Sequence, residues 1–119
     1  MTYTTDLIIV NFNTKAYLAA CIESIRAHTL PPDYRLTIVD NASTDGSIEY
    51  IRTLPGITAV FNAKNTGYAT ACNLGIKEGN GKFIFLLNSD LVMTPSWLPP
   101  LLKTLSDPEV AVVGPRLVN

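Results

Sequence analysis

The chain has 119 residues and a formal net charge of −1, with nine basic side chains against ten acidic ones. This length fits one domain or part of one, and the balanced charge excludes a protein that follows a nucleic-acid backbone, because such proteins carry a basic excess. Hydrophobic residues make up 47% of the chain and charged residues 16%, a composition that excludes a disordered polypeptide.

Apolar clusters along the chain predict strands and helices in strict alternation. Nearly continuous apolar runs predict strands at 6–10, 36–39, 57–61, 82–87 and 110–113. The i, i+3, i+4, i+7 spacing of Leu18, Cys21, Ile22 and Ile25 predicts a first helix between the first two strands. Further helices are expected at 48–54, 68–77 and 96–105.

This order of elements predicts an α/β fold built from βαβ units, in which a mostly parallel sheet carries helices on both faces. The sequence shows no repeat or linker, so residues 1–119 are expected to form a single domain. Ligands of open α/β sheets bind beyond the carboxyl ends of the strands. The segments that follow the strands, and so the first candidates for a site, are 11–13, 40–43, 62–67 and 88–90.

These segments are rich in Asn, Asp and Ser, which also form turns and helix caps in any α/β protein. Ser43 or Asp45 is expected to cap the second helix, and Asn65 or Thr66 the third. Asp40 ends the second strand, where a carboxylate either caps the next helix or accepts hydrogen bonds from a ribose or a base. Spacing alone leaves both roles of Asp40 open.

Asp90 follows a buried strand, and no Lys or Arg lies near it in the sequence. A carboxylate in such a place costs free energy unless it is paired or binds a metal. A divalent cation that also holds a diphosphate would supply the missing charge. The sequence therefore favours a metal ligand at Asp90 over a solvated turn residue.

Other common kinds of site find little support in this sequence. It has no G-x-x-x-x-G-K-[ST], and the first turn, 11–15, has no glycine for a dinucleotide motif. His28 is expected at the end of the first helix, where it suits the helix dipole. Cys21 and Cys72 lack basic neighbours and are interpreted as reduced core residues of a cytosolic chain. Neither a secretory signal nor a membrane-spanning run is visible.

Four segments occur in a fixed order, with the sequences LIIVNFN, IVDNASTDGS, NTGYATACNLG and LLNSD. Together they resemble the nucleotide-binding half of family 2 glycosyltransferases, which are inverting enzymes with the Rossmann-like GT-A fold. The resemblance extends from about Asp6 to Asn119, and Asn88 in the last motif is similar to what some rhamnosyltransferase-like members carry. It implies that the donor is a nucleotide sugar, such as a dTDP- or UDP-sugar, and that the acceptor is a glycan or a lipid-linked sugar.

The resemblance also implies roles for the residues at matching positions. Asp90 and Asn88 match the D-x-D motif, which holds Mg²⁺ or Mn²⁺ against the diphosphate. The cation stabilises the negative charge that grows on the leaving group. The positions that match donor-nucleotide contacts are Val10, Asn11, Phe12, Asp40, Asn41, Asn65, Gly67, Asn73 and Ser89.

Two positions depart from the family pattern. Asn88 is an amide where the motif has its first carboxylate, so cation binding is expected to be weak unless nucleotide is present. Cys72 stands where many relatives have a basic residue. Neutralisation of the phosphates is therefore expected from the cation, from Lys64 or from groups outside the chain.

No carboxylate matches the general base that the inverting reaction needs. Those that follow Asp90 are Asp107 and Glu109, and neither fits the family by motif or by distance along the chain. The sequence therefore predicts a donor-binding part, truncated before the acceptor half and inactive alone. Truncation would leave uncovered the apolar face that packs on the missing half, which agrees with the mean hydropathy of +0.22, and a homodimer or a swapped arrangement is therefore expected.

Family resemblance further implies polysaccharide or cell-wall synthesis in the cytoplasm, with at most peripheral attachment to the inner face of the cell membrane. Two other classes of protein compete with this function. A receiver-like or flavodoxin-like module is disfavoured, because residues 11–13 lack the acidic cluster that a receiver needs. A non-catalytic scaffold or oligomerisation module that keeps the fold stays open, because of the departures at Asn88 and Cys72.

Overall fold

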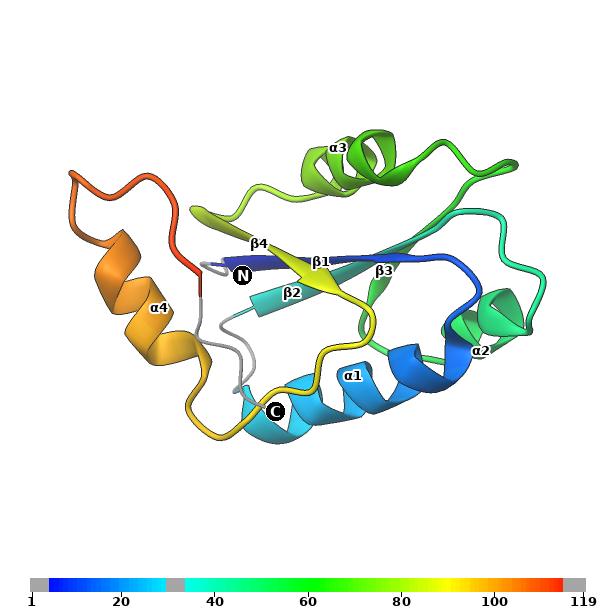
Figure 1. Cartoon of the computed structure of the whole chain (residues 1–119), viewed down its shortest axis with the longest axis horizontal. Helices are drawn as coiled ribbons and strands as arrows, with labels where there is room; N and C mark the ends of the chain where they lie inside the picture. Colours follow the sequence, from blue (N-terminus) through cyan, green and yellow to red (C-terminus); the bar gives the residue numbers. More distant parts are fainter. Residues whose placement is uncertain (1–4, 30–33, 115–119) are drawn as a thin grey trace.

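The structure is a computed structural model, and it describes residues 5–29 and 34–114. Four strands form one sheet in the order β3-β2-β1-β4 (Figure 1). All three pairings between neighbouring strands are parallel. The strands are β1 (Thr5–Asn11), β2 (Tyr34–Asp40), β3 (Thr58–Phe61) and β4 (Phe83–Asn88). The predicted α/β alternation and parallel sheet are confirmed up to this strand.

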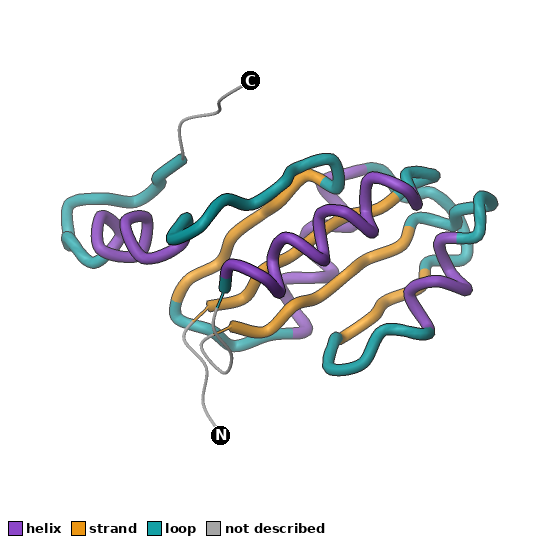
Figure 2. The backbone as a smooth tube through the Cα atoms, turned by 90° about the horizontal axis from the view of Figure 1, so that it is seen from below, coloured by secondary structure: helices purple, strands orange, loops and turns teal. Residues whose placement is uncertain are grey.

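Helices lie on both faces of the sheet, as predicted (Figures 1 and 2). One face carries α1 and α2, the other carries α3, and α4 lies beside the sheet. No helix of residues 5–29 and 34–114 has the length and apolar character that crossing a bilayer requires. The helices are α1 (Lys15–His28), α2 (Ser47–Arg52), α3 (Tyr68–Glu78) and α4 (Leu98–Leu105).

The main core lies between α1 and the sheet. Leu7 and Ile9 are alternate residues of β1, so both point to the same face, and both are fully buried. They pack in one cluster with the four α1 positions that the helical spacing predicted, all of which are buried. On the opposite face, Ile8 and Val39 approach Gly75 of α3 so closely that a β-carbon at Gly75 would stand 2.6 Å from Ile8 Cγ2.

The predicted fifth strand is wrong. Residues 110–113 form no strand, and Val112 is 87% exposed. An apolar run becomes a strand only where a neighbouring strand pairs with its backbone. Among the described residues, this segment pairs with no strand, although the sheet ends at β4 with a free edge. Two of the helix boundaries differ from the prediction by two residues: α2 stops at Arg52, before Leu54, and α4 begins at Leu98.

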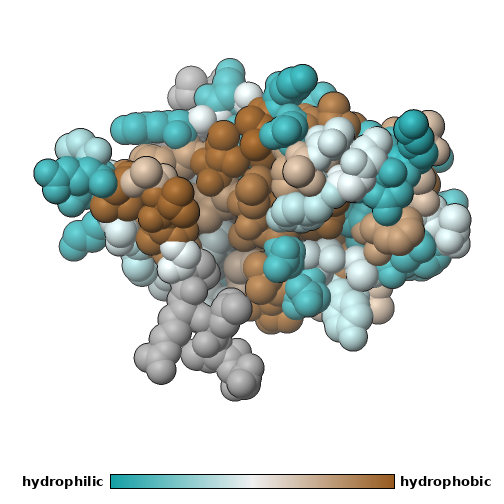
Figure 3. Space-filling model, turned by 45° about the horizontal axis from the view of Figure 1, so that its top comes forward, coloured by the Kyte–Doolittle hydropathy of each residue, from teal (hydrophilic) through white to brown (hydrophobic). Residues whose placement is uncertain are grey.

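The α3 face of the sheet is only partly covered. α3 lies mainly over β1 and β2, so the β4 side chains that point to this face have no helix above them. Ile84 and Leu86 are 45% and 48% exposed. Figure 3 shows hydrophobic side chains gathered over the middle of the face of the molecule seen there.

Candidate functional site

The last residues of the four strands lie at one edge of the sheet, which we call the carboxyl rim: Asn11, Asp40, Phe61 and Asn88. The register pairs Asn11 with Asp40 and Val10 with Asn88, so the ends of β2, β1 and β4 are adjacent. The ends of β2 and β4 are therefore two strand spacings apart, about 10 Å. The prediction that the polar segments gather at one edge is confirmed.

At this rim, the carboxylate of Asp40 is completely buried and holds the loop that follows β2. Its Oδ1 accepts hydrogen bonds from Asn11 Nδ2 at 2.9 Å and from Ser43 Oγ at 2.7 Å. Its Oδ2 accepts one from the backbone N–H of Ser43 at 2.9 Å. Asn11 is equally inaccessible. In the described conformation Asp40 holds the loop through Ser43 and does not cap α2, which begins at Ser47; its contact with a ribose or a base stays a prediction.

A second buried side chain, Asn41, joins the ends of β2 and β3. Its Oδ1 accepts hydrogen bonds from Asn62 Nδ2 at 2.8 Å and from Thr66 Oγ1 at 3.2 Å. Its Nδ2 donates to the carbonyl oxygen of Gly67 at 3.2 Å. Gly67 precedes α3 with a φ of 86°, a left-handed value that only glycine adopts at little cost. Asn41 therefore fixes the start of α3 relative to the sheet.

The loops after β1 and β2 are also tied to each other. The backbone N–H of Thr44 donates to Asn13 Oδ1 at 2.7 Å, and the N–H of Lys15, the first residue of α1, donates to Asp45 Oδ2 at 2.9 Å. Asp45 also accepts from the N–H of Ser47, the first residue of α2. The Ser47 hydroxyl is the main cause that lowers the pKa of Asp45 below its ordinary value. One carboxylate thus accepts hydrogen bonds from the first N–H groups of both α1 and α2.

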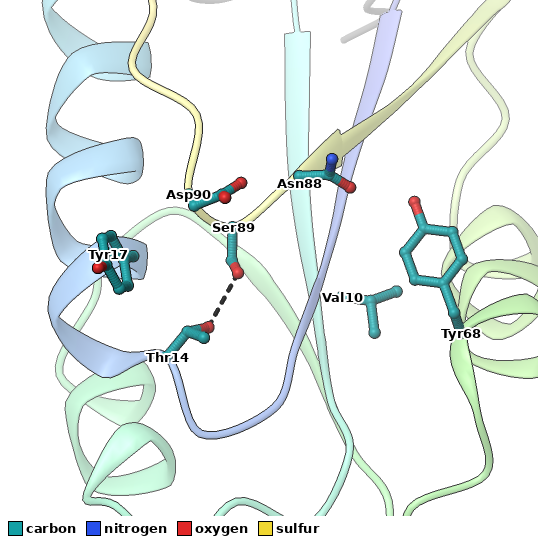
Figure 4. Close-up of a pocket in the computed structure, with 7 residues that line it drawn as sticks. All are labelled: Val10, Thr14, Tyr17, Tyr68, Asn88, Ser89 and Asp90. Atoms are coloured by element: carbon teal, nitrogen blue, oxygen red, sulfur yellow. Dashed lines mark hydrogen bonds between the residues drawn. The ribbon is translucent and has the colours of Figure 1, made fainter.

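Between the ends of β1 and β4 and the starts of α1 and α3 lies an open cavity of about 420 Å³ (Figure 4). Tyr17 and Tyr68 stand on opposite sides of it, and the turn after β4 lies between them. The hydroxyls of Thr14 and Ser89 are 2.8 Å apart, which ties the start of α1 to this turn. The cavity is lined by Val10, Thr14, Tyr17, Tyr68, Asn88, Ser89 and Asp90.

Polar atoms in this cavity suit a hard cation only with help from a ligand. Asp90 and Asn88 are exposed and Ser89 is half-buried, so a carboxylate, an amide and a hydroxyl are at hand. Oxygen atoms of this kind are the ligands that Mg²⁺ and Mn²⁺ prefer. In the described part of the chain, no group of three or more His, Cys, Asp or Glu side chains could hold a metal. A cation at Asp90 therefore needs further oxygens, which a diphosphate carries.

Neither cysteine is arranged as a nucleophile. Cys21 and Cys72 are both buried and free. Burial raises the pKa of the Cys21 thiol to about 11, and the nearby charge of Asp90 adds to the effect. Such a thiol stays protonated at neutral pH. His28 lies in the last turn of α1, as predicted.

The cavity brings together four of the predicted site residues: Val10, Asn88, Ser89 and Asp90. The other predicted residues lie outside its lining, some as buried supports of the rim and some exposed around it: Asn11, Phe12, Asp40, Asn41, Asn65, Gly67 and Asn73.

Three lining residues were not predicted from the sequence: Thr14, Tyr17 and Tyr68. Thr14 and Tyr68 stand at the starts of α1 and α3, just after polar segments that were singled out. The available signal was this position at a helix start beside the rim. It did not show which way the side chains point.

An all-parallel α/β sheet with a polar cavity at its carboxyl rim is the arrangement in which open α/β domains bind their ligands. The model of the family described as glycosyl transferase family 2 matches residues 6–119. The chain belongs to this family.

Comparisons with single proteins agree. YwdF of Bacillus subtilis, an uncharacterised glycosyltransferase, is 34% identical over 103 residues, which cover 84% of this chain and 37% of YwdF. The mannosyltransferase PcManGT from Pyrobaculum calidifontis, solved in complex with GDP-Man and Mn²⁺, superposes with a TM-score of 0.83 at 26% identity over 92% of this chain and 34% of that one. S. aureus TarS 1-349, solved with UDP-GlcNAc, superposes with a TM-score of 0.78 at 17% identity, covering 87% and 31%.

These matches establish the GT-A type of fold that the resemblance implied. The chain spans about a third of the length of each of these relatives.

Proposed function

We propose that this chain binds the nucleoside diphosphate part of a sugar donor at the carboxyl rim, together with Mg²⁺ or Mn²⁺ at Asp90. The observation that carries the proposal is the cavity between β1 and β4, which holds Asn88, Ser89 and Asp90 in one place. The family supports it, as do the GDP-Man and Mn²⁺ bound by the mannosyltransferase and the UDP-GlcNAc bound by TarS.

Within this proposal, the whole protein transfers the sugar to a glycan or a lipid-linked acceptor with inversion at the anomeric carbon. The divalent cation would supply positive charge to the leaving diphosphate. Asp90 would hold it, with Asn88 as a neutral neighbour, and the buried supports Asp40 and Asn41 would keep the rim in shape. Phe12, 47% exposed beside this rim, is available for stacking on a base.

A base for the acceptor hydroxyl is not provided at this cavity. Asp107 and Glu109 are exposed in the turn after α4, where the Glu109 N–H donates to Asp107 Oδ1 at 2.9 Å. Neither lines the cavity. The proposal therefore assigns donor binding to this chain and the proton-accepting group of the transfer to other parts of the enzyme.

Calorimetric titration of UDP, dTDP and GDP, each with and without Mn²⁺, tests the proposed function. We expect binding of at least one nucleotide that requires Mn²⁺ and is lost in Asp90→Ala. Asp107→Ala is the matched control, because it removes an exposed carboxylate outside the cavity and should bind as the wild type does. Absence of nucleotide binding by the wild-type chain would instead support the non-catalytic scaffold, and binding that Asp90→Ala leaves intact would refute the proposed role of Asp90.

We further propose that a second copy of the chain covers both the unpaired backbone edge of β4 and its exposed apolar side chains. In the described part of the chain β4 is an edge strand. Its side chains Ile84 and Leu86 are about half exposed. An unpaired edge next to apolar side chains favours pairing with another strand. Sedimentation at ~100 μM should then show a dimer, since micromolar affinity corresponds to only about −8 kcal/mol. A monomer at that concentration, or a dimer that Ile84→Lys leaves intact, would refute this arrangement.

A further inference from the structure

A chain of hydrogen bonds leads from the buried carboxylate of Asp40 to the cavity. Asn11 Nδ2 donates to Asp40 Oδ1 at 2.9 Å, and Asn11 Oδ1 accepts from Thr14 Oγ1 at 2.7 Å. Thr14 Oγ1 in turn lies 2.8 Å from Ser89 Oγ. Thr14 and Ser89 both line the cavity, and Figure 4 shows the bond between them. This series of hydrogen bonds joins the ends of β2 and β1 to the turn after β4.

The numbers of donors and acceptors on these side chains determine which group donates in each of the three hydrogen bonds that link Asp40 to Ser89. An ionised carboxylate can only accept, so the amide of Asn11 must turn its NH₂ group to Asp40 and its oxygen to Thr14. Thr14 has a single hydroxyl proton, and the Asn11 oxygen takes it. Between Thr14 and Ser89, Thr14 must therefore accept, and Ser89 must donate.

This direction determines what Ser89 offers to a ligand. A serine hydroxyl has one proton and two lone pairs, and here the proton is given to Thr14. Only lone pairs are left to face the cavity, beside the carboxylate of Asp90, which when ionised also only accepts. A phosphate oxygen has only lone pairs to present to the lone pairs of Ser89, so the two oxygens repel each other. A hydroxyl of the ligand can instead donate a hydrogen bond to Ser89.

We propose that Thr14 is a positioning residue, which turns the proton of Ser89 away from the cavity so that Ser89 accepts a hydrogen bond from a hydroxyl of the donor sugar. This inference rests on the proposed function and adds to it which part of the donor meets Ser89. Thr14 acts through Ser89 and touches no reacting atom. The diphosphate then lies on the side of Asp90 and the cation.

The first test compares the affinity for a sugar nucleotide with that for its nucleoside diphosphate. The probe pairs are UDP-GlcNAc with UDP and GDP-mannose with GDP, each with Mn²⁺. Thr14→Val lets the Ser89 proton rotate towards the ligand, so we expect roughly 5-fold weaker binding of the sugar nucleotide and less than about 2-fold change for the diphosphate. Ser89→Ala should show the same selective loss, and Thr14→Ser, which keeps the hydroxyl, should bind as the wild type does. Thr94→Val changes an exposed threonine outside the cavity and is the matched control.

Equal losses of affinity for both probes of a pair would mean that Thr14 only supports the fold, and an unchanged affinity for both would mean that it has no role; either result overturns the inference.

A second test needs no ligand. If Thr14 and Ser89 act through one bond, the double variant Thr14→Val with Ser89→Ala should unfold at the same urea concentration as the less stable single variant. Fully additive shifts would overturn the inference, whereas failure of the wild type to bind any nucleotide with Mn²⁺ would overturn the proposed function.

Discussion

Replacement of Asp40 by asparagine tests whether this residue acts inside the fold or on the ligand. Asp40→Asn keeps the shape of the side chain and exchanges one carboxylate oxygen for an NH₂ group. The smallest loss arises when the amide oxygen stays at the Oδ1 position, where the carboxylate accepts two hydrogen bonds. The NH₂ group then faces the Ser43 N–H, which donates to Oδ2 in the wild type.

The magnitude follows from the contacts that are lost. A hydrogen bond to a charged group contributes about 1.5–3 kcal/mol, and buried donors left without an acceptor cost about 1–3 kcal/mol more. Because Asp40 is fully buried, water cannot replace the lost partner. We expect the free energy of unfolding to fall by about 3–5 kcal/mol, which at a urea m-value of about 2 kcal/mol/M lowers the midpoint by about 2 M.

Urea unfolding followed by circular dichroism measures this midpoint, with Asp90→Asn as the matched control. Asp90 is an exposed carboxylate near the same rim, so its replacement should leave the midpoint almost unchanged and weaken the Mn²⁺-dependent binding of nucleotide. The opposite pattern for Asp40→Asn, with wild-type stability and lost nucleotide binding, would refute the reasoning. It would show that the loop opens and that Asp40 contacts the ligand directly.

Three further predictions concern the fold around the site. Gly75→Ala places a β-carbon 2.6 Å from Ile8 Cγ2, and the overpacking cost of about 1–3 kcal/mol should exceed the helix-propensity gain of about 1 kcal/mol, so the variant should be less stable than the wild type. Adding Ile8→Ala to this variant should relieve part of the overpacking. A urea midpoint of Gly75→Ala no lower than that of the wild type would contradict the prediction. The Ser47 hydroxyl is the main cause of the lowered pKa of Asp45, and the ionised carboxylate stabilises the fold at pH values above the ordinary aspartate pKa of 3.8. This stability is lost as the pH falls through the lower pKa of the folded state, so Asp45→Asn should flatten the acid dependence of the thermal melting temperature. An unchanged pH profile would count against the hydrogen bonds of Asp45 to the two helix starts. Burial raises the pKa of Cys21 to about 11, so this thiol should resist alkylation by iodoacetamide at pH 8 in the native protein and react after unfolding. Mass spectrometry locates the label, and rapid labelling of Cys21 in the native protein would disprove its protection.

The sheet and the gathering of polar segments could be predicted from the sequence because both depend on local patterns. Buried parallel strands read as apolar runs, and the carboxyl ends of parallel strands meet at one edge whatever their order. Asn88, Ser89 and Asp90 were therefore expected at this rim, but the pairing of β1 with β4 that brings Asn88 beside Val10 was not predicted. The run at 110–113 has the same apolar character, yet it forms no strand.

Side-chain direction could not be predicted in this way. Asp40 and Asp90 both follow apolar strands, but Asp40 is fully buried and Asp90 is exposed. The difference comes from partners that are distant in the sequence: Asn11 lies 29 residues from Asp40 and donates to its carboxylate. Thr14 could not be recognised either, because its partner Ser89 is 75 residues away.

The sequence by itself determined the alternation of elements, the edge at which ligands are expected and the residue types available there, because these follow from hydrophobic period and chain direction. Tertiary structure alone decided which polar groups are used up inside the rim and which remain free to meet a ligand. The physical reason is that a hydrogen-bonding group has few donors and acceptors. Whether any of them is left over depends on neighbours that only folding brings within 3 Å or so.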